Sequence, residues 1–335
     1  MQNNQEFLHL KSFMQTFDWL PITQILGKTG FSRRGRKKEF KPLNLFRAFL
    51  LKSYLLIDDN TTLVKRFYEN KHYLEFCELK KSPSHDVLCK FEKEYSYKFE
   101  RIFSFLDDIL EKSGVFEDDD MSFDGTDIPV PMKNKQSPHR YHFGAKSSRK
   151  KFHGFWLMIS ASIKHQIPRK FIVGYAREGQ INLAKELFKE EQIDKSKNNI
   201  FIIMDGIFDF REMHEIIISV QHKIPLIGYN QRGSGIPERI NLPSDNWHFQ
   251  INPVYKNDEF VKEEFKKRTS IERVNSYSKV YTQICLIQNK IKKSHTVKKT
   301  TVETIITSSF ILEQFKLLEK IKTKRIQQQL SIYGN

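Results

Sequence analysis

Three carboxylates of the chain have the residue type and the setting that metal-dependent chemistry requires. Asp124 and Asp205 each close a short apolar run and each precede a glycine, and Glu272 follows in a basic, polar stretch. Carboxylate oxygens are ligands that Mg²⁺ and Mn²⁺ prefer. Two such ions roughly 4 Å apart can activate an attacking oxygen and stabilise a leaving oxygen in phosphodiester displacement. We therefore predict a site for Mg²⁺ or Mn²⁺, with two ions, at these three residues.

Each carboxylate also has a purely structural interpretation. Aspartate beside glycine often caps a turn or a helix, and either aspartate taken alone fits that role as well as a catalytic one. Glu272 lies four residues after Arg268, so the two could form a surface ion pair worth only a few tenths of a kcal/mol. The residues alone leave both interpretations open.

The stretch FKKRTSIERVNSYSK, residues 265–279, is expected to form the helix that carries Glu272. Helix breakers are absent there, because no proline or glycine occurs between residues 254 and 333. At about 100° per residue, the residues on the same side of this helix as Glu272 are Phe265, Arg268 and Lys279. The opposite side carries the stripe expected to be buried: Ile271, Val274, Ser278 and Tyr281.

Rigid strands must hold the two aspartates if they are to act together. Apolar, β-branched and aromatic runs predict strands at residues 121–130, 155–163, 169–176 and 199–205. A turn at Pro168 is expected to join the second and third of these as a hairpin. Amphipathic helices are predicted at residues 181–193 and 210–220, and a loop-rich insertion around residues 229–255. This succession predicts an α/β domain over residues 115–335.

The first part of the chain is predicted to be an all-α domain of residues 1–114. Apolar residues at helical spacing indicate helices at residues 44–57, 61–76 and 82–112. Asp59 or Asn60 is expected to cap the second of these helices. Gly114 and the acidic run FEDDD after it mark the boundary to the α/β domain.

The composition favours a polyanionic partner. The 56 basic residues exceed the 40 acidic ones by 16, which points to nucleic acid ahead of an anionic membrane surface. We expect no membrane span and no signal peptide, because no apolar run is long enough and the first residues lack the pattern. Three separated cysteines fit reduced thiols, so we expect a cytoplasmic protein associated with the nucleoid.

Two basic segments are candidates for phosphate contact. Residues 133–154 contain no acidic side chain, and we expect DNA contacts there from Lys146, Arg149, Lys150 and Lys151, with a solvated loop as the alternative. Residues 31–41 contain Arg33, Arg34 and Arg36. That segment fits an arm on DNA and a solvated linker equally well.

In its motifs and their order, the sequence resembles DDE-type insertion-sequence transposases that carry the Y-R-E-K signature. That signature is Tyr, two residues, Arg, three residues, Glu, six residues, Lys, and this chain has Phe265, Arg268, Glu272 and Lys279 at that spacing. SFDGTDIP and MDGIFDFREM resemble the segments with the first and second aspartates of that family. FHGFWLM and IPLIGYNQRGS resemble the strands between those motifs, and RFYENKHYLEFCELKKSPSHDVLCKFEK resembles the helical domain in front of many such cores.

The resemblance implies an RNase-H-like core, with a mixed sheet flanked by helices, behind an all-α domain for DNA-end binding or dimerisation. It implies that Asp124, Asp205 and Glu272 are the metal ligands. Arg268 and Lys279 would contact DNA near the element end. Phe265 replaces a tyrosine, so the ring can still stack or pack, but it lacks the phenolic hydroxyl.

These features lead to one function and two alternatives. We expect a transposase that binds terminal inverted repeats as a homodimer on double-stranded DNA, cleaves at the element ends and joins the ends to target DNA. The alternatives are a catalytically silent DNA-binding regulator derived from a transposase, and a stand-alone RNase-H-like nuclease.

Overall fold

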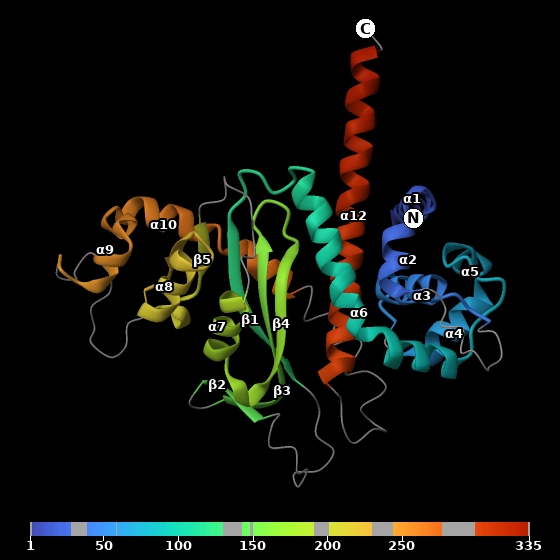
Figure 1. The fold of residues 1–335 in the computed structure, drawn as a ribbon, viewed down its shortest axis with the longest axis horizontal. Coiled ribbons are helices and arrows are strands. Elements are labelled where there is room, and N and C mark those ends of the chain that lie inside the picture. The colour runs from blue at the N-terminus through green and yellow to red at the C-terminus, as the bar shows by residue number, and fades with distance from the viewer. Residues whose placement is uncertain are drawn as a thin grey trace. The chain divides into compact units, whose positions relative to one another are not determined.

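The chain divides into two compact units in the computed structural model, which describes residues 2–27, 39–57, 59–129, 143–147, 150–190, 201–229, 244–276 and 299–333. We call Met1–Leu110 with Ile284–Asn335 the helical unit, and Glu111–Gln283 the sheet unit. Figure 1 shows the elements of each. The predicted domains place the carboxy-terminal residues with the sheet, whereas the described helix of residues 299–333 groups with the helical unit.

The helical unit consists of helices whose ends follow from local sequence signals. Pro42 lies in the first turn of α3, and the Asp59 carboxylate caps α4 by accepting hydrogen bonds from the backbone of Thr61 and Thr62 at 2.6 and 2.9 Å. The helices are α1 (Gln2–Thr16), α2 (Leu20–Leu26), α3 (Pro42–Tyr54), α4 (Asn60–Glu69), α5 (Lys71–Phe76), α6 (His85–Lys112) and α12 (Lys299–Tyr333).

The helix predicted at residues 61–76 is two helices. Asn70 has an extended backbone between α4 and α5, and its side chain accepts a hydrogen bond from the backbone of His72 at 3.0 Å. Because an asparagine that caps a new helix competes with continuation of the old one, the chain breaks there.

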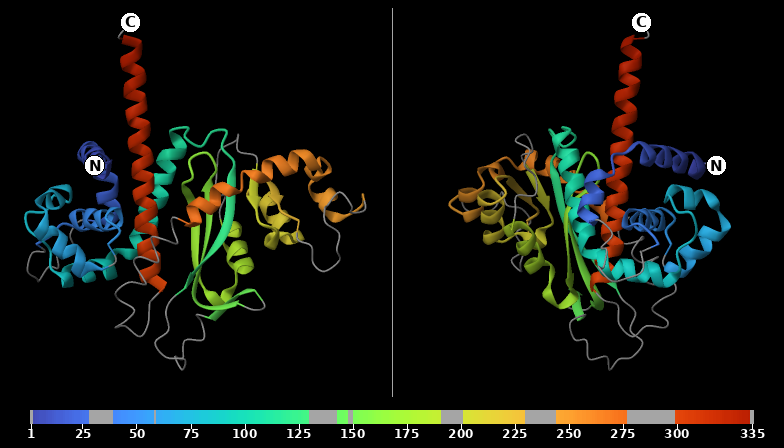
Figure 2. Two further views of the ribbon diagram at one scale, coloured as in Figure 1. Left: turned by 180° about the vertical axis from the view of Figure 1, so that it is seen from behind. Right: turned by 45° about the vertical axis from the view of Figure 1, so that its right-hand side comes forward.

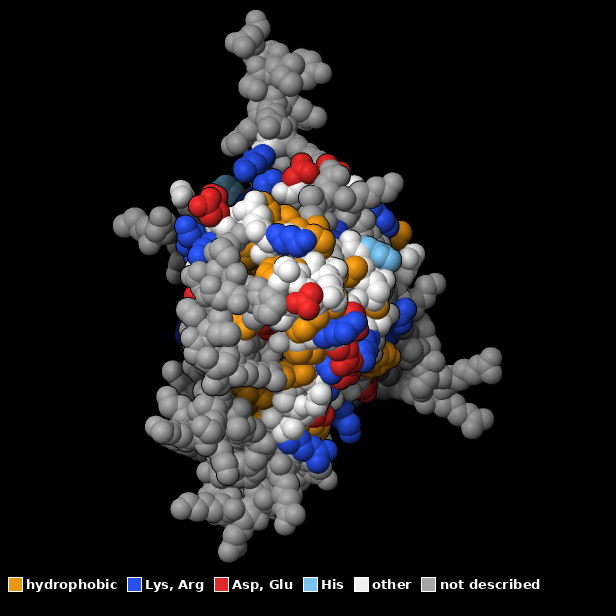
Figure 3. Space-filling model, turned by 90° about the vertical axis from the view of Figure 1, so that its left-hand side faces the viewer, with side chains coloured by type: hydrophobic (Ala, Val, Ile, Leu, Met, Phe, Trp, Pro, Cys, Tyr) orange, Lys and Arg blue, Asp and Glu red, His pale blue; other side chains and the backbone are white. Residues whose placement is uncertain are grey.

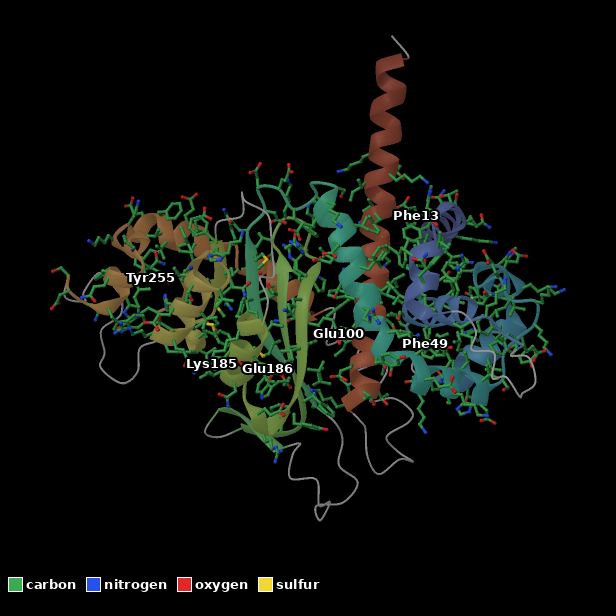
Figure 4. The ribbon with its side chains drawn as sticks, in the orientation of Figure 1. Phe13, Phe49, Glu100, Lys185, Glu186 and Tyr255 are labelled. Carbon is green, nitrogen blue, oxygen red and sulfur yellow. The ribbon has the colours of Figure 1, made fainter. Side chains whose placement is uncertain are left out.

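Aromatic packing holds the helical unit together. Phe49, labelled in Figure 4, lies 5.6 Å from Phe91 and 5.9 Å from Phe99 between ring centroids. Gln314 of α12 donates a hydrogen bond to the Phe103 carbonyl of α6 at 3.1 Å. The Gln314 hydrogen bond connects the carboxy-terminal helix to this unit.

The sheet unit is built on a mixed six-stranded sheet, which confirms the predicted α/β class. Its strands are β1 (Met121–Pro129), β2 (Phe143–Ser147), β3 (Lys150–Ser162), β4 (Pro168–Tyr175), β5 (Phe201–Met204) and β6 (Ile224–Ile227). Their order is β2-β3-β1-β5-β6, with β4 also paired to β3. The pairs β2–β3, β3–β4 and β1–β3 are antiparallel, whereas β1–β5 and β5–β6 are parallel.

Helices cover the two faces of this sheet differently. On one face, α7 (Gln180–Glu190) and α8 (Arg211–Ser219) pack over a core in which the Phe123 ring meets Phe188 and Phe208 at 4.8 and 5.2 Å. Figure 1 shows α7 in front of the strands, and the left view of Figure 2 shows the orange helical segment on the opposite side. Neighbouring residues of β1 therefore point to different surroundings.

Two segments differ from the prediction of loops. The insertion expected around residues 229–255 contains α9 (Trp247–Ile251) and the short 3₁₀ helix η5 (Pro253–Lys256), followed by α10 (Asp258–Lys266). Part of the basic segment 133–154 is also regular, because β2 pairs with the first residues of β3. That part is therefore a strand and not a loop, and whether its basic side chains contact DNA stays a prediction.

The close pairing of β1 with β3 depends on a residue without a side chain at position 154. A Cβ on Gly154 would lie 2.0 Å from the Ile128 carbonyl oxygen. We expect Gly154→Ala to lower the free energy of unfolding in urea by more than about 2 kcal/mol. Gly179→Ala is the control, because Gly179 also has positive φ but has nothing within 4 Å of its Cβ, so it should lose only about 1 kcal/mol. Equal losses in the two variants would contradict the strand contact.

Candidate active site

The pairing of two parallel strands brings Asp124 and Asp205 together. The last pair in the register of β1 and β5 is Phe123 with Met204. The residue that follows each member of this pair is an aspartate, Asp124 after β1 residue Phe123 and Asp205 after the end of β5. Neighbouring strands lie about 4.8 Å apart, and residues in register point to the same side. Because Phe123 and Met204 point into the apolar core, the two aspartates point to the other face. Their carboxylates are close enough to repel each other.

The Asp124 carboxylate is partly buried and partly compensated. Its Oδ1 accepts a hydrogen bond from the Gly125 backbone at 2.7 Å, and its Oδ2 accepts one from Asn275 Nδ2 at 2.9 Å. Burial is the main cause that raises the pKa of Asp124 to about 6, and the charge of Asp205 adds to it. The Gly125 hydrogen bond and the Arg268 guanidinium act in the opposite direction. A carboxylate in this state gains from a nearby cation.

A helix of residues 269–276 covers the face to which the aspartates point. Ser270 Oγ lies 3.2 Å from Ser122 Oγ on β1, which fixes the start of this helix on the sheet. Ile271 and Val274 are buried. Burial of these two residues agrees with the buried stripe predicted for this stretch, whereas Ser278 and Tyr281 lie outside the described residues.

The prediction of one continuous helix over residues 265–279 is wrong at residues 267 and 268. Helix α10 ends at Lys266, and the backbone N–H groups of Lys267 and Arg268 bond to carbonyls only three residues back, at 3.0 and 3.1 Å. This tight turn redirects the chain before residues 269–276. The angular position expected for Phe265 relative to Glu272 on one ideal helix therefore does not hold, because the two residues lie on different helices.

Phe265 packs where the turns after β5 and β6 meet. A Cβ on Gly228 would lie 2.9 Å from the Phe265 ring, and one on Gly206 would lie 3.1 Å from the Gly228 carbonyl oxygen. The Arg268 guanidinium lies 5.6 Å from the Phe265 ring centroid. The ring thus occupies space that Gly228 leaves open, Gly206 leaves room for the Gly228 backbone, and the ring supports the side chain of Arg268.

Glu272 is paired with Arg268 across one turn. Its Oε1 accepts a hydrogen bond from an Arg268 Nη at 3.1 Å, and the exposed fractions of the two side chains are 55% and 23%. This is the ion pair of the structural interpretation. The Arg268 guanidinium also acts electrostatically on Asp124. Its positive charge is therefore shared between Glu272 and the aspartate pair.

The structure brings together part of the predicted set of ligands. Asp124 and Asp205 are neighbours, but the oxygens of all three carboxylates do not form a group within 4.8 Å of one another in the described part of the chain. Lys146, Lys150 and Lys151 lie on β2 and β3, and their side chains are not described. The predicted DNA-contact residues that lie outside the described residues are Lys279, Arg149, Arg33, Arg34 and Arg36.

Asn275 belongs to the site, although sequence reasoning missed it. Besides donating to Asp124, it has a buried Oδ1 with no hydrogen-bond partner among the described residues. The signal was available, since Asn275 follows Glu272 by three residues and Arg268 by seven, which is helical spacing. An amide there adds an oxygen ligand or a hydrogen-bond donor to the carboxylate pair.

Basic and acidic side chains are mixed on one face of the molecule. Figure 3 shows Lys and Arg beside Asp and Glu on this face, with hydrophobic side chains between them. The described side chains there do not form a continuous basic surface. The net charge of +16 is therefore not displayed as one patch on that face.

A comparison with protein families matches the first part of the chain. A family model described as Transposase domain (DUF772) matches residues 2–94, less than a third of the chain. This segment includes α1 to α5 and the start of α6, all in the helical unit. The match supports a transposase-related function, and with it DNA binding. A search of curated proteins found no match to the chain.

Among the described residues, no helix combines the length and the apolar character that crossing a bilayer requires.

Replacement of Asp124 by asparagine tests whether the charge of this carboxylate destabilises the fold. Its pKa is raised from the ordinary value of 3.8 to about 6, so its charge destabilises the fold increasingly as pH rises through this range and fully above it. In protein freed of divalent ions, Asp124→Asn should therefore raise the free energy of unfolding by about 2 kcal/mol near pH 7.5, and the gain should vanish below about pH 4. A gain that is the same at both pH values, measured in urea, would contradict the assignment.

A double-mutant cycle tests the ion pair of Glu272. Because both side chains are partly exposed, the coupling between Arg268→Ala and Glu272→Ala should be at most about 0.5 kcal/mol in unfolding by urea without divalent ions. A coupling above about 1 kcal/mol would make the pair a structural element in its own right, and Glu272 would then not be available as a metal ligand.

Proposed function

We propose that this protein is a DDE-type transposase of the Y-R-E-K group, in which phenylalanine replaces the tyrosine of the signature. It cleaves DNA at the ends of an element and joins those ends to target DNA. The observation that carries the proposal is the carboxylate pair of Asp124 and Asp205 on neighbouring parallel strands, covered by the helix with Glu272. The mixed sheet flanked by helices supports an RNase-H-like core within residues 115–283.

The donor set at this site fits Mg²⁺ or Mn²⁺. Asp124, Asp205 and Glu272 offer hard oxygen ligands, and the buried Oδ1 of Asn275 adds a fourth oxygen without a partner among the described residues. Repulsion between the two aspartates, which helps to raise the pKa of Asp124, is removed when a cation lies between them. Bound ions would activate the attacking oxygen and stabilise the leaving oxygen at phosphorus.

The other residues of the site act on the DNA phosphates and on the carboxylates. Arg268 has a planar guanidinium that matches a phosphate with two hydrogen bonds. In the structure Arg268 is paired with Glu272. A DNA phosphate that binds Arg268 would break this pair, and Glu272 would then be available to the metal site at the aspartates. Phe265 holds Arg268 in place through its ring. Water attack first exposes a 3′-hydroxyl, and the same site then directs that hydroxyl to target DNA, since both steps are displacements at phosphorus.

The helical domain has a separate task in this proposal. The match to a transposase domain lies within residues 2–94, which supports binding of the terminal inverted repeats, or dimerisation, by residues 1–114. Two element ends must be paired for joining, so the active form is a homodimer. Lys279 and the basic residues of segments 31–41 and 133–154 are expected to contact phosphates.

The test is a cleavage and joining assay on the DNA that flanks the gene, with Mg²⁺ or Mn²⁺. Wild type should nick defined element ends and give joined products. Asp205→Asn and Glu272→Gln should lower both activities by at least about 100-fold. Glu263→Gln is the matched control, because Glu263 is an exposed glutamate of α10 outside the site, and it should retain the wild-type rate.

The products distinguish the alternatives. Nicks without joined products would indicate a stand-alone nuclease. Specific binding to the element ends without any metal-dependent product, by protein that is folded by circular dichroism, would indicate a DNA-binding regulator. Either result would contradict the transposase proposal.

A further inference from the structure

A second cluster of possible metal ligands lies on the other side of the turn that follows Asp205. It consists of Asp209, His214 of α8 and His248 of α9, and their ligand atoms lie within 4.8 Å of one another. His214 Nε2 lies 3.2 Å and His248 Nε2 lies 3.1 Å from the same oxygen, Asp209 Oδ1. In the described part of the chain this is the one group of three His, Cys, Asp or Glu side chains so arranged.

The three side chains are almost completely shielded from water. The exposed fractions are 2% for Asp209, 0% for His214 and 7% for His248. Aromatic rings surround the imidazoles: Trp247 stacks on His248 at 3.6 Å, and Tyr255, labelled in Figure 4, lies 5.7 Å from His214 between ring centroids. A buried carboxylate in such surroundings requires positive charge beside it.

The hydrogen bonds of Asn246 determine the tautomer of His248. Asn246 Oδ1 accepts a hydrogen bond from the backbone N–H of His248 at 3.1 Å, so this atom of the amide is the oxygen. The same oxygen lies 2.7 Å from His248 Nδ1. Since an oxygen without hydrogen can only accept, Nδ1 carries the proton and donates it. The lone pair of a neutral His248 is therefore on Nε2.

This tautomer directs a lone pair at an anionic oxygen. Nε2 of His248 faces Asp209 Oδ1 at 3.1 Å and Oδ2 at 3.3 Å, and two acceptors at that distance repel unless a cation joins them. That cation is either a second proton on the imidazole or a metal ion. A histidine that binds a metal through Nε2 commonly donates its Nδ1 proton to an oxygen of a neighbouring group, as here.

The distances are compatible with a metal ion, and the chemistry of the ligands decides which kind of ion fits. Zinc is held at about 2.0–2.1 Å by imidazole nitrogen and at about 2.0–2.2 Å by carboxylate oxygen, in tetrahedral sites whose ligand atoms are roughly 3.4 Å apart. The nitrogen–oxygen separations of 3.1, 3.2 and 3.3 Å are close to that edge. Two imidazoles and one carboxylate suit Zn²⁺ and similar transition metals, and not Mg²⁺.

We propose that Asp209, His214 and His248 form a binding site for a transition-metal ion of the zinc class, separate from the carboxylate pair at Asp124 and Asp205. Its role is structural. It would clip α9 to the start of α8 and hold the turn that begins at Asp205.

The surrounding contacts show what such a clip would stabilise. The 3₁₀ helix η3 (Gly206–Phe208) is the whole connection between Asp205 and Asp209, and the Asp209 backbone donates to the Gly206 carbonyl at 3.0 Å. On the other side, the Tyr255 hydroxyl bonds to the Pro225 carbonyl at 3.0 Å and accepts from the Ile227 backbone at 2.9 Å. A metal ion there would connect the insertion to the ends of β5 and β6, where Asp205 is presented.

The experiment measures metal content and coordination in the full chain. Protein stripped with a chelator is titrated with Zn²⁺ in competition with a chromophoric chelator, and with Co²⁺ while its visible spectrum is recorded. We expect one equivalent of zinc and a tetrahedral cobalt spectrum. His214→Gln, His248→Gln and Asp209→Asn should each weaken binding by at least about 100-fold, and Asn246→Ala, which removes no ligand, by about 10-fold to 100-fold.

Two controls separate this site from other places that bind metal. His85→Gln removes an exposed histidine on α6 whose Nε2 lies 3.5 Å from the Cys89 sulfur, and it should bind zinc like wild type. The double variant Asp124→Asn with Asp205→Asn should also retain zinc, even though the transposase proposal predicts that it is inactive. Failure of one proposal is thus distinct from failure of the other.

The outcomes that would overturn the proposal are specific. They are wild-type protein that takes up no stoichiometric zinc, an octahedral cobalt spectrum, and zinc that is lost in His85→Gln but kept in His248→Gln. If a ligand variant fails to fold, the wild-type stoichiometry, its cobalt spectrum and the Asn246→Ala affinity still decide. A protein that binds no metal but is destabilised by these substitutions holds the cluster with a proton.

Discussion

Two like charges held on adjacent parallel strands are the constraint on which the rest of the sheet unit depends. The register of β1 and β5 places Asp124 and Asp205 side by side, and both point away from the apolar core. Repulsion and burial together raise the pKa of Asp124. A fold keeps such an arrangement only if other groups offset its cost, and the neighbouring residues do so by hydrogen bonds and charge.

The compensation comes from elements that follow much later in the sequence. Residues 269–276 contribute Asn275, which donates to Asp124, and the turn before them contributes Arg268. Helix α10, which precedes that turn, approaches the sheet because Gly228 leaves room for the Phe265 ring and Gly206 leaves room for the Gly228 backbone. The helix that stabilises the aspartate pair through Asn275 also carries Glu272, whose side chain is exposed and paired with Arg268.

Much of this arrangement could be predicted from local patterns. The strand at Asp124, the hairpin after it, the strand at Asp205 and the helices of the first hundred residues all follow apolar periodicity, and the Asp59 cap follows its residue type. The turn at residues 267–268 could not be predicted, because no proline or glycine marks it. Phe265 before the turn packs against the cluster that contains Ile203 and Leu226, which is a tertiary contact that no local pattern reports.

The roles of polar residues were harder to predict than the fold. Asn275 and His248 matter through partners far away in sequence, Asp124 and Asp209, so no short motif reveals them. Pairing within a helix, as between Arg268 and Glu272, was visible from spacing alone. Spacing does not decide whether Glu272 is half of an ion pair or a metal ligand. That choice depends on what else approaches Arg268.

Binding of Mn²⁺, followed by electron paramagnetic resonance, tests the central claim that the aspartate pair is a metal site. Free Mn²⁺ gives a six-line signal that weakens when the ion binds. With the Asp209, His214 and His248 cluster first saturated with Zn²⁺, the account predicts that the wild-type chain takes up as many as about two equivalents of Mn²⁺, that the double variant Asp124→Asn with Asp205→Asn takes up none, and that Glu263→Gln binds like wild type. Equal uptake by wild type and the double variant would show that the two carboxylates do not bind the metal. That result would contradict the proposed catalytic role of the pair.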